Sequence, residues 1–212
     1  MQLTGYTESG VSLTVRGKQR HYEYALQGGH NALNLTAAMT LLCAVTPKYN
    51  ETKLKKRLRE LQPAFGRGEV ITLPSGGSLT LQLVKNPGGF TQALRMLELK
   101  EYSVIGIAIN DDYPDGRDVS WLWDVDFSDV RSHPIILCGG TRAADMANRL
   151  KYDDCRTTAT EESIPEYATI LDAAVAKAKG EAILFCTYTA MRKLRAIYLG
   201  SRSGLDEEDV EL

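Results

Sequence analysis

The sequence predicts an α/β protein built on an open, doubly wound and mostly parallel sheet. From Glu69 onward, strand-like segments alternate with helix-like segments, the order typical of such sheets. The segments 104–109 and 135–138 are apolar at successive positions. Both faces of these strands are therefore expected to be covered by helices, as in the interior of a parallel sheet. The larger part of the chain is predicted to be Rossmann-like.

The elements of this larger part follow from length, periodicity and flanking turn residues. Strands are expected at 70–73, 79–84, 103–109, 134–138 and 182–186, with a weaker one at 152–155. Helices are expected at 89–100, 141–150, 164–179 and 190–199. With 212 residues, 43% hydrophobic and 25% charged, the chain can bury a core without a metal or disulfide.

The first 65 residues have a different pattern. Apolar and polar residues alternate over 11–26, which predicts a β-hairpin or two edge strands. A helix is expected over 34–45, ending before Pro47, and a second, basic helix over 51–61. The apolar face expected for the first helix consists of Leu33, Ala37, Met39, Leu42 and Val45. These elements are too few to form a complete domain.

Charge and composition exclude several classes of protein. A net charge of −2 argues against a nucleic-acid binder, which usually carries a basic excess. No apolar run reaches the length of a membrane span, and the first residues do not resemble a secretory signal, so we expect a cytoplasmic protein. The cysteines are Cys43, Cys138, Cys155 and Cys186. They lack metal-ligand spacing, so no metal site is expected; three end or lie in apolar runs, whereas Cys155 lies in a polar loop.

The familiar phosphate-binding motifs are absent. No G-x-x-x-x-G-K-[ST] occurs, and no G-x-G-x-x-G follows a strand. Gly139 and Gly140 follow a strand and open a helix, so their N–H groups could hold an anion. A tight turn that needs glycine is the favoured explanation of the pair. We therefore expect that this chain alone has no loop that binds the phosphates of a nucleoside triphosphate.

An acidic segment, 110–126, follows a predicted interior strand. Its six aspartates repel one another unless Arg117, a metal or a partner compensates. Trp121 and Trp123 share a face if this segment is extended. The alternative to a binding segment is a solvated loop whose tryptophans pack on the core.

Four strings resemble the Mur ligase family. They are Gly-His-Asn-Ala-Leu-Asn-Leu-Thr-Ala-Ala at 29–38, Phe-Gly-Arg-Gly-Glu at 65–69, Lys-Asn-Pro-Gly-Gly-Phe at 85–90, and the stretch 115–126. The first is similar to the helix that closes the central ATPase domain, and the second to the junction into the carboxy-terminal domain. The last two, with Thr-Tyr-Thr-Ala at 187–190, resemble the MurT branch, the ligase-like subunits of lipid II isoglutaminyl synthase.

This resemblance implies a domain division. Residues 1–65 would be the end of a Mur central ATPase domain, and 66–212 a MurT-type carboxy-terminal α/β domain. The P-loop, the magnesium-binding carboxylates and the zinc ribbon of a complete MurT are absent from the sequence. The chain is thus expected to be part of a longer ligase and to be inactive alone.

The implied activity is an amidation of the α-carboxylate of D-glutamate in the lipid II stem peptide at the membrane surface. ATP and Mg²⁺ would be used by the full-length enzyme, with neither held by this chain alone. A GatD-like glutaminase subunit would supply ammonia from glutamine, and no nucleic acid is expected as a partner. The alternative is a catalytically silent α/β interaction domain that docks a glutaminase or other partner through its acidic-aromatic loop.

The resemblance also implies roles for particular residues. Asn31 and Asn34 would lie near adenine, although Asn31 could instead cap its helix. Arg67, oriented by Glu69, would approach the nucleotide, although a surface salt bridge is the alternative. Lys85 and Asn86 would face the substrate, where a lysine can stabilise an acyl phosphate.

One carboxylate would act in the partner's chemistry. Class I glutaminases hydrolyse glutamine with a cysteine that a histidine activates, and a carboxylate usually orients this histidine. The resemblance implies that Asp118 supplies this carboxylate as a catalytic residue, with Asp115 and Asp124 as fallback candidates. The alternative is that Asp118 only caps a turn.

Overall fold

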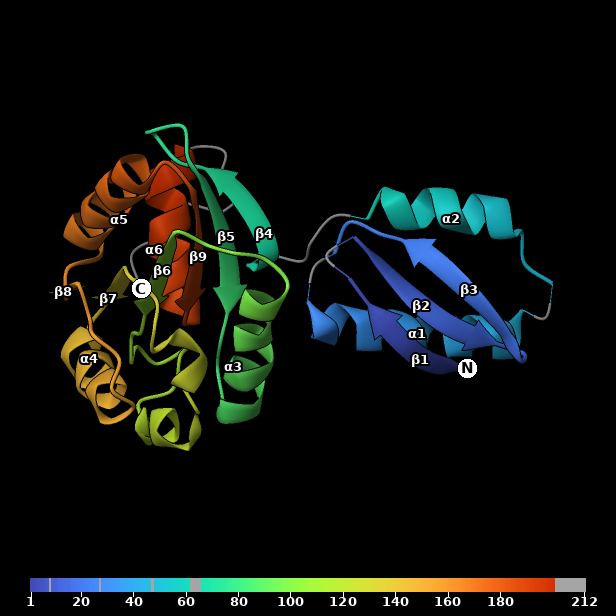
Figure 1. Cartoon of the computed structure of the whole chain (residues 1–212), viewed down its shortest axis with the longest axis horizontal. Coiled ribbons are helices and arrows are strands. Elements are labelled where there is room, and N and C mark those ends of the chain that lie inside the picture. The colour runs from blue at the N-terminus through green and yellow to red at the C-terminus, as the bar shows by residue number, and fades with distance from the viewer. Residues whose placement is uncertain (8, 27, 47, 62–65, 201–212) are drawn as a thin grey trace.

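Figure 1 shows the computed structural model, which describes residues 1–200 except 8, 27, 47 and 62–65. The described strands form two separate sheets, one of three strands and one of six. We call residues 1–61 the N-terminal unit and residues 66–200 the C-terminal unit. Among the described residues, no helix is long and apolar enough to span a lipid bilayer.

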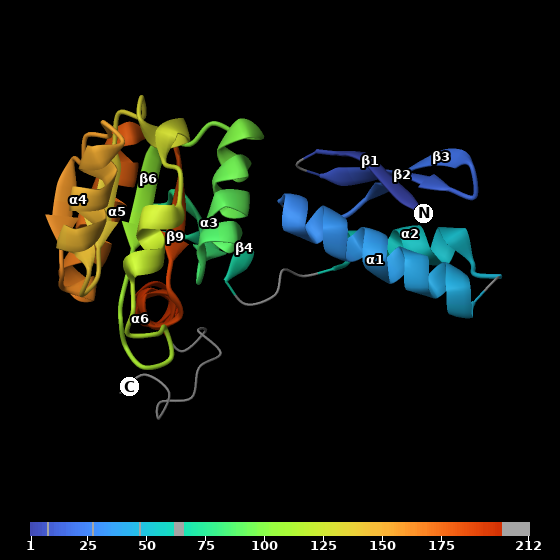
Figure 2. The same ribbon diagram turned by 90° about the horizontal axis from the view of Figure 1, so that it is seen from below.

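The N-terminal unit is a three-stranded antiparallel sheet covered on one face by two helices (Figure 2). Its elements are β1 (Gln2–Tyr6), β2 (Gly10–Val15), β3 (Lys18–Glu23), α1 (Gly29–Val45) and α2 (Glu51–Arg59). The expected hairpin is β2–β3. Arg16 and Gly17 both have positive φ, the geometry of a two-residue turn that matches the twist of the strands.

Helix α1 packs on the sheet through only part of the expected face. Met39 and Leu42 contact the core as expected, but Ala32 and Leu35 join them in place of Leu33, Ala37 and Val45, which are exposed. The expectation was wrong for these three because α1 carries apolar side chains on two sides, so periodicity alone does not show which side meets the sheet.

The C-terminal unit contains the expected doubly wound sheet. Its strands are β4 (Arg67–Thr72), β5 (Ser78–Leu83), β6 (Val104–Ala108), β7 (Ile136–Gly139), β8 (Ala159–Glu161) and β9 (Glu181–Cys186). Its α-helices are α3 (Pro87–Leu94), α4 (Ala143–Tyr152), α5 (Ile164–Ala178) and α6 (Tyr188–Leu199). Three short 3₁₀ helices, η1 (Arg95–Glu98), η2 (Ser120–Asp124) and η3 (Ser128–Val130), lie in the connections.

The order of the strands is β4-β5-β9-β6-β7-β8, and every pair except β4–β5 is parallel. Helices α3 and α4 pack on one face, and α5 and α6 on the other. The central strand β6 is fully buried along its length. The fold class expected from the sequence is confirmed.

The weak strand expected at 152–155 is wrong. Tyr152 ends α4, and Asp154 adopts a left-handed conformation with φ of 59°. The strand at this edge of the sheet is instead β8, which begins at Ala159, seven residues after Tyr152. Cys155 lies in the loop after α4, as expected, but its side chain is buried, and its thiol donates to the carbonyl oxygen of Phe127 at 3.5 Å.

Candidate active site

The carboxyl ends of the parallel strands meet at one edge of the C-terminal unit, the position where open α/β sheets bind ligands. A pocket of about 310 Å³ lies at this edge, lined in part by the ends of β5 and β9. Two of the predicted binding residues, Arg67 and Lys85, line it together with Asp115. Two cations at one hollow suit a phosphate or carboxylate group.

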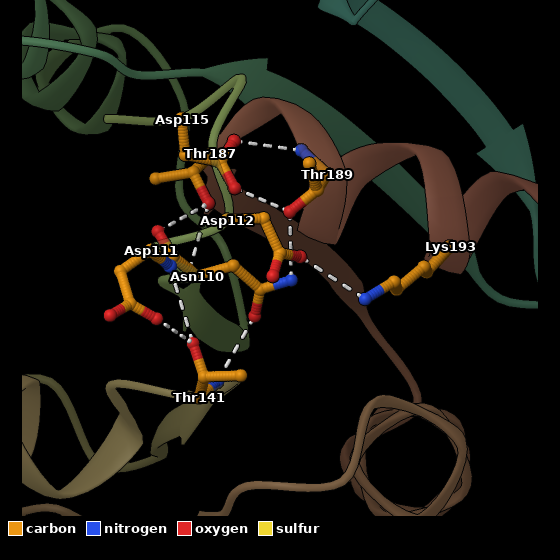
Figure 3. Close-up of polar contacts among 8 residues, drawn as sticks. All are labelled: Asn110, Asp111, Asp112, Asp115, Thr141, Thr187, Thr189 and Lys193. Carbon is orange, nitrogen blue, oxygen red and sulfur yellow. Dashed lines mark hydrogen bonds and ion pairs between the residues drawn. The ribbon is translucent and has the colours of Figure 1, made fainter. Parts of the chain in front are cut away.

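Asn110, two residues after the end of β6, connects several elements at this edge through hydrogen bonds (Figure 3). It is 1% exposed, and its side-chain amide donates to Thr189 Oγ1 at 2.9 Å. Its side-chain oxygen accepts from the backbone N–H of Thr141 at 3.0 Å, and its own N–H donates to Thr187 Oγ1 at 2.9 Å. One buried amide thus joins the ends of three neighbouring strands, which makes the floor of the site rigid.

Asp115 is a buried cap for helix α6. One carboxylate oxygen accepts from the Thr189 N–H at 2.8 Å, and the other accepts from the Thr189 hydroxyl. Burial raises the pKa of Asp115, while these hydrogen bonds oppose the rise. The helix N-terminus already holds an internal carboxylate, so Asp115 has a structural task at this edge.

The neighbouring aspartates are compensated within the fold. Asp111 accepts from the Thr141 hydroxyl at 2.8 Å and pairs with Arg142 at 2.8 Å, and these contacts, with Thr141 first, lower its pKa. Asp112 pairs with Lys193 at 3.2 Å (Figure 3). The required compensation therefore comes from other elements of the chain rather than from Arg117.

The glycine pair after β7 forms a tight turn. Gly140 has φ of 90°, and a Cβ there would lie 2.5 Å from the side-chain oxygen of Asn110. The backbone N–H groups of Gly140, Thr141 and Arg142 all donate to oxygens of the protein. The turn explanation therefore accounts for the glycines, and these N–H groups are not available to an anion.

Asp118 lies in a second hollow of about 320 Å³, which also contains Arg117, Trp123 and Arg149. The Asp118 carboxylate is exposed and accepts from the Ser120 N–H at 2.8 Å, which lowers its pKa. This bond between residues two apart closes a turn just before η2, so Asp118 does cap a turn. Its exposure and ionisation still leave it able to meet a histidine of another protein. Asp124 is also exposed.

The two tryptophans do not share a face. Trp121 packs toward Phe90 of the core, with ring centroids 6.3 Å apart. Trp123 is 51% exposed, and its ring meets the ring of the exposed Tyr152 edge-on, with the two centroids 5.1 Å apart. The guanidinium carbon of Arg149 lies 5.4 Å from the centroid of the Trp123 ring. The expectation failed because the segment is a 3₁₀ helix rather than extended, and residues two apart then point in different directions.

The remaining predicted site residues divide between the units. Asn86 is the N-cap of α3, where its side chain accepts from the Gly89 N–H at 2.7 Å. Asn31 is buried in the first turn of α1, and Asn34 is exposed one turn later. Asn31 is not the cap of α1, since Gly28 occupies that position.

Glu69 does not orient Arg67. Its carboxylate pairs with Arg195 of α6 and accepts from the Gly66 N–H at 3.2 Å. Burial, and then the nearby Arg67 guanidinium, lower the pKa of His30 at the start of α1. Arg67 therefore lies near the start of α1, where Asn31 also lies, and lines the pocket that contains Lys85.

Sequence reasoning did not find Thr189 and Asn110 as organising residues. Their signal is weak, because a threonine at a helix start and an asparagine after a strand are common. Among the residues that the structure describes, no group of three or more His, Cys, Asp or Glu side chains could hold a metal ion.

The fold resembles those of solved ligase structures. A MurF from Acinetobacter baumannii superposes with a TM-score of 0.68 over 96% of this chain and 44% of that chain, at 17% identity. A folylpolyglutamate synthase from Thermotoga maritima superposes with a TM-score of 0.64 over 100% of this chain and 48% of that chain, at 13% identity. The fold is thus the one found in the Mur ligases.

Sequence similarity identifies which branch of the Mur ligases this chain resembles. The family model for the MurT ligase C-terminal domain matches residues 83–191. The MurT subunit of lipid II isoglutaminyl synthase from Streptococcus pneumoniae is 31% identical over 194 residues, which is 88% of this chain and 42% of that protein. The corresponding subunit from Staphylococcus aureus COL is 33% identical over 133 residues, 61% of this chain and 30% of that protein.

The chain belongs to the MurT ligase family. It spans less than half the length of the curated relatives it matches.

Proposed function

We propose that this chain is the carboxy-terminal part of the ligase subunit of a lipid II isoglutaminyl synthase. Residues 1–65 would end its central ATPase domain, and 66–212 would form its carboxy-terminal domain. The reaction would be ATP-dependent amidation of the D-glutamate α-carboxylate in the stem peptide. The family match supports this, and so does the pairing of Arg67 and Lys85 in one pocket at the carboxyl edge of the sheet.

The residues of this pocket fit ATP or an acyl phosphate in part. A carboxylate is a poor electrophile until it is phosphorylated, and phosphorylation adds negative charge that cations must offset. Lys85 and Arg67 would hold that charge, and Asn31 and Asn34 would supply amide donors and acceptors for adenine. The described aspartates near the pocket are engaged with other side chains, so they do not fit a Mg²⁺ site.

Lys85 provides the direct test of this proposal. In the complete ligase assembled with its glutaminase, Lys85→Ala should reduce amidation by roughly 10²–10³, the usual cost of removing one electrostatic stabiliser. Lys177→Ala, an exposed lysine on α5, is the matched control and should leave the rate unchanged. Full amidation by the Lys85→Ala complex would contradict the proposal.

A GatD-like glutaminase subunit is the proposed partner, with Asp118 orienting its histidine. Asp118→Asn should leave the complex assembled but reduce glutamine hydrolysis by roughly 10²–10⁴. Asp118→Glu should restore part of the activity, and the pH profile of hydrolysis should change only in the Asn variant. Unchanged hydrolysis in an assembled Asp118→Asn complex would shift the role to Asp124, since Asp115 is committed to α6.

The second candidate is a catalytically silent docking domain. The exposed contact of Trp123 with Tyr152 favours it, because aromatic residues are enriched in the centres of protein interfaces. If Lys85→Ala left amidation intact while Trp123→Ala abolished assembly, this candidate would replace the first.

A further inference from the structure

The two units carry opposite net charges. Residues 1–65 contain nine Lys and Arg against four Asp and Glu, a net charge of +5. The C-terminal unit, residues 66–200, contains fifteen Lys and Arg against eighteen Asp and Glu, a net charge of −3, and residues 201–212 add a further −4. The net charge of −2 for the whole chain conceals this separation. A protein with such charge asymmetry is oriented by a charged surface.

The basic charge of the N-terminal unit gathers at one end. A hollow of about 400 Å³ is formed by the β2–β3 turn and the connection from α1 to α2. Arg16, Lys18, Arg20 and Lys48 line this hollow. Figure 1 shows the turn and the connection at the end of the unit that points away from the six-stranded sheet. We call this region the basic end.

The carboxylates near the basic end neutralise it only in part, since Glu51, which also lines the hollow, pairs with Arg20. The described carboxylates of this unit are Glu23, Glu51 and Glu60, and each already pairs with a cation of β3 or α2. Lys18 and Lys48 are exposed, and no salt bridge joins either to another described residue. Lys18 and Lys48 are therefore cations of the hollow that no described carboxylate neutralises.

We propose that the basic end binds the anionic headgroups of a phospholipid membrane. A membrane is an extended negative surface, and clusters of Lys and Arg bind it through its phosphates. Contact at this end keeps the acidic C-terminal unit beyond roughly one Debye length, ~8 Å, so that its repulsion by the membrane is screened. The exposed basic side of α2, with Lys53 and Lys56, would extend the contact.

Nucleic acid is a less suitable occupant. Single-stranded nucleic acids are usually held by exposed aromatic rings on which bases stack. The aromatic ring at this hollow, Tyr49, is half-buried, and its hydroxyl faces Tyr22 and Cys43. A long polyanion that continued past the hollow would also meet the acidic unit. The proposal is independent of the amidation reaction, because it concerns only attachment.

Vesicle sedimentation tests this proposal with the complete 212-residue chain. Vesicles of 30% phosphatidylglycerol in phosphatidylcholine should sediment the chain, and pure phosphatidylcholine vesicles should not. Each cation near an anionic surface is worth roughly a fivefold change in partitioning, so the triple variant Arg16→Gln, Lys18→Gln, Lys48→Gln should bind roughly 100-fold more weakly. Added salt should weaken binding of the unchanged chain.

A matched control removes the same charge elsewhere. The triple variant Lys151→Gln, Arg156→Gln, Lys177→Gln alters exposed cations of the C-terminal unit and should bind as the unchanged chain does. Equal loss in both triple variants would overturn the proposal, as would absence of binding to the anionic vesicles. Displacement by inorganic phosphate at constant ionic strength would assign the hollow to a free anion, and stronger binding to single-stranded DNA would assign it to nucleic acid. Either result would also overturn the proposal. None of these measurements uses amidation, so failure of the proposed function would leave the result intact.

Discussion

The two units differ in how completely they bury their apolar side chains. In the C-terminal unit, two helices cover each face of the sheet, and β6 and most of β9 are fully buried. In the N-terminal unit, α1 covers the sheet with one side only. On its other side, Leu33, Leu41 and Val45 are 57%, 64% and 69% exposed. A helix with apolar side chains on opposite sides is usually buried on both sides. The outer apolar side of α1 is uncovered, whereas both faces of the sheet in the C-terminal unit are covered.

The largest expected effect concerns catalysis, which neither unit should support alone. The sequence contains no phosphate-gripping loop, so the purified chain should show no magnesium-dependent ATP hydrolysis. A coupled assay for ADP release would measure it. ATP hydrolysis that co-purifies with the chain and disappears in the Arg67→Ala variant would contradict this prediction. It would show that the two units together hydrolyse ATP.

Truncation of one apolar side chain in each unit should separate their packing. Phe185→Ala in β9 removes a fully buried ring and should cost about 3–5 kcal/mol of the free energy of unfolding. Leu41→Ala removes an exposed side chain and should change it by no more than about 0.5 kcal/mol. Urea denaturation measures both.

The same Leu41→Ala change sharpens the comparison in the complete ligase. If the rest of that protein covers α1, the substitution should there cost about 2 kcal/mol or more, as for other buried leucines. A neutral effect in the complete ligase would show that the outer side of α1 stays exposed.

Hydrogen exchange should reveal the same difference without any substitution. Amide protons of 13–42 should exchange faster than those of 104–109, because the first segment belongs to a partly covered unit and the second to a covered strand. Exchange followed by mass spectrometry on peptides from both segments would measure it. Equal protection would mean that the two units open together.

The smallest expected effect is on acid stability. The pKa values of Asp111, Asp118, Asp126 and Asp153 in the C-terminal unit are lowered, compared with Glu51 alone in the described N-terminal unit. A lowered pKa means that the ionised form stabilises the fold. This contribution is present above the ordinary aspartate value of 3.8 and is lost as pH falls through the lower folded value.

Both tryptophans belong to the C-terminal unit, so their fluorescence during acid unfolding reports this unit. Thr141→Val removes the hydrogen bond that most lowers the pKa of Asp111 and should move the midpoint to higher pH, at a cost of about 1 kcal/mol. Thr169→Val on α5 is the control, because the Thr169 hydroxyl bonds only a carbonyl oxygen of its own helix. Identical midpoints would show that Asp111 does not contribute.

The sequence alone determined the elements whose surroundings are uniform. Strands β6 and β9 are apolar at successive positions, and this pattern requires cover on both faces. Strand β2 alternates cleanly, so its inward residues Val11, Leu13 and Val15 were predictable. The motif strings were sufficient to indicate the family, which the match over 83–191 shows.

The tertiary structure decided which partner each residue takes where several residues of one type lie close together in the sequence. Asp111, Asp115 and Asp118 belong to one acidic segment, yet they bond respectively to Thr141, to Thr189 and to Ser120. The first two partners are 30 and 74 residues away along the chain. Likewise, the side of α1 that faces the sheet depends on where β1 and β2 lie. Such choices are set by contacts between distant segments, and a local pattern carries no information about which distant segment will supply the contact.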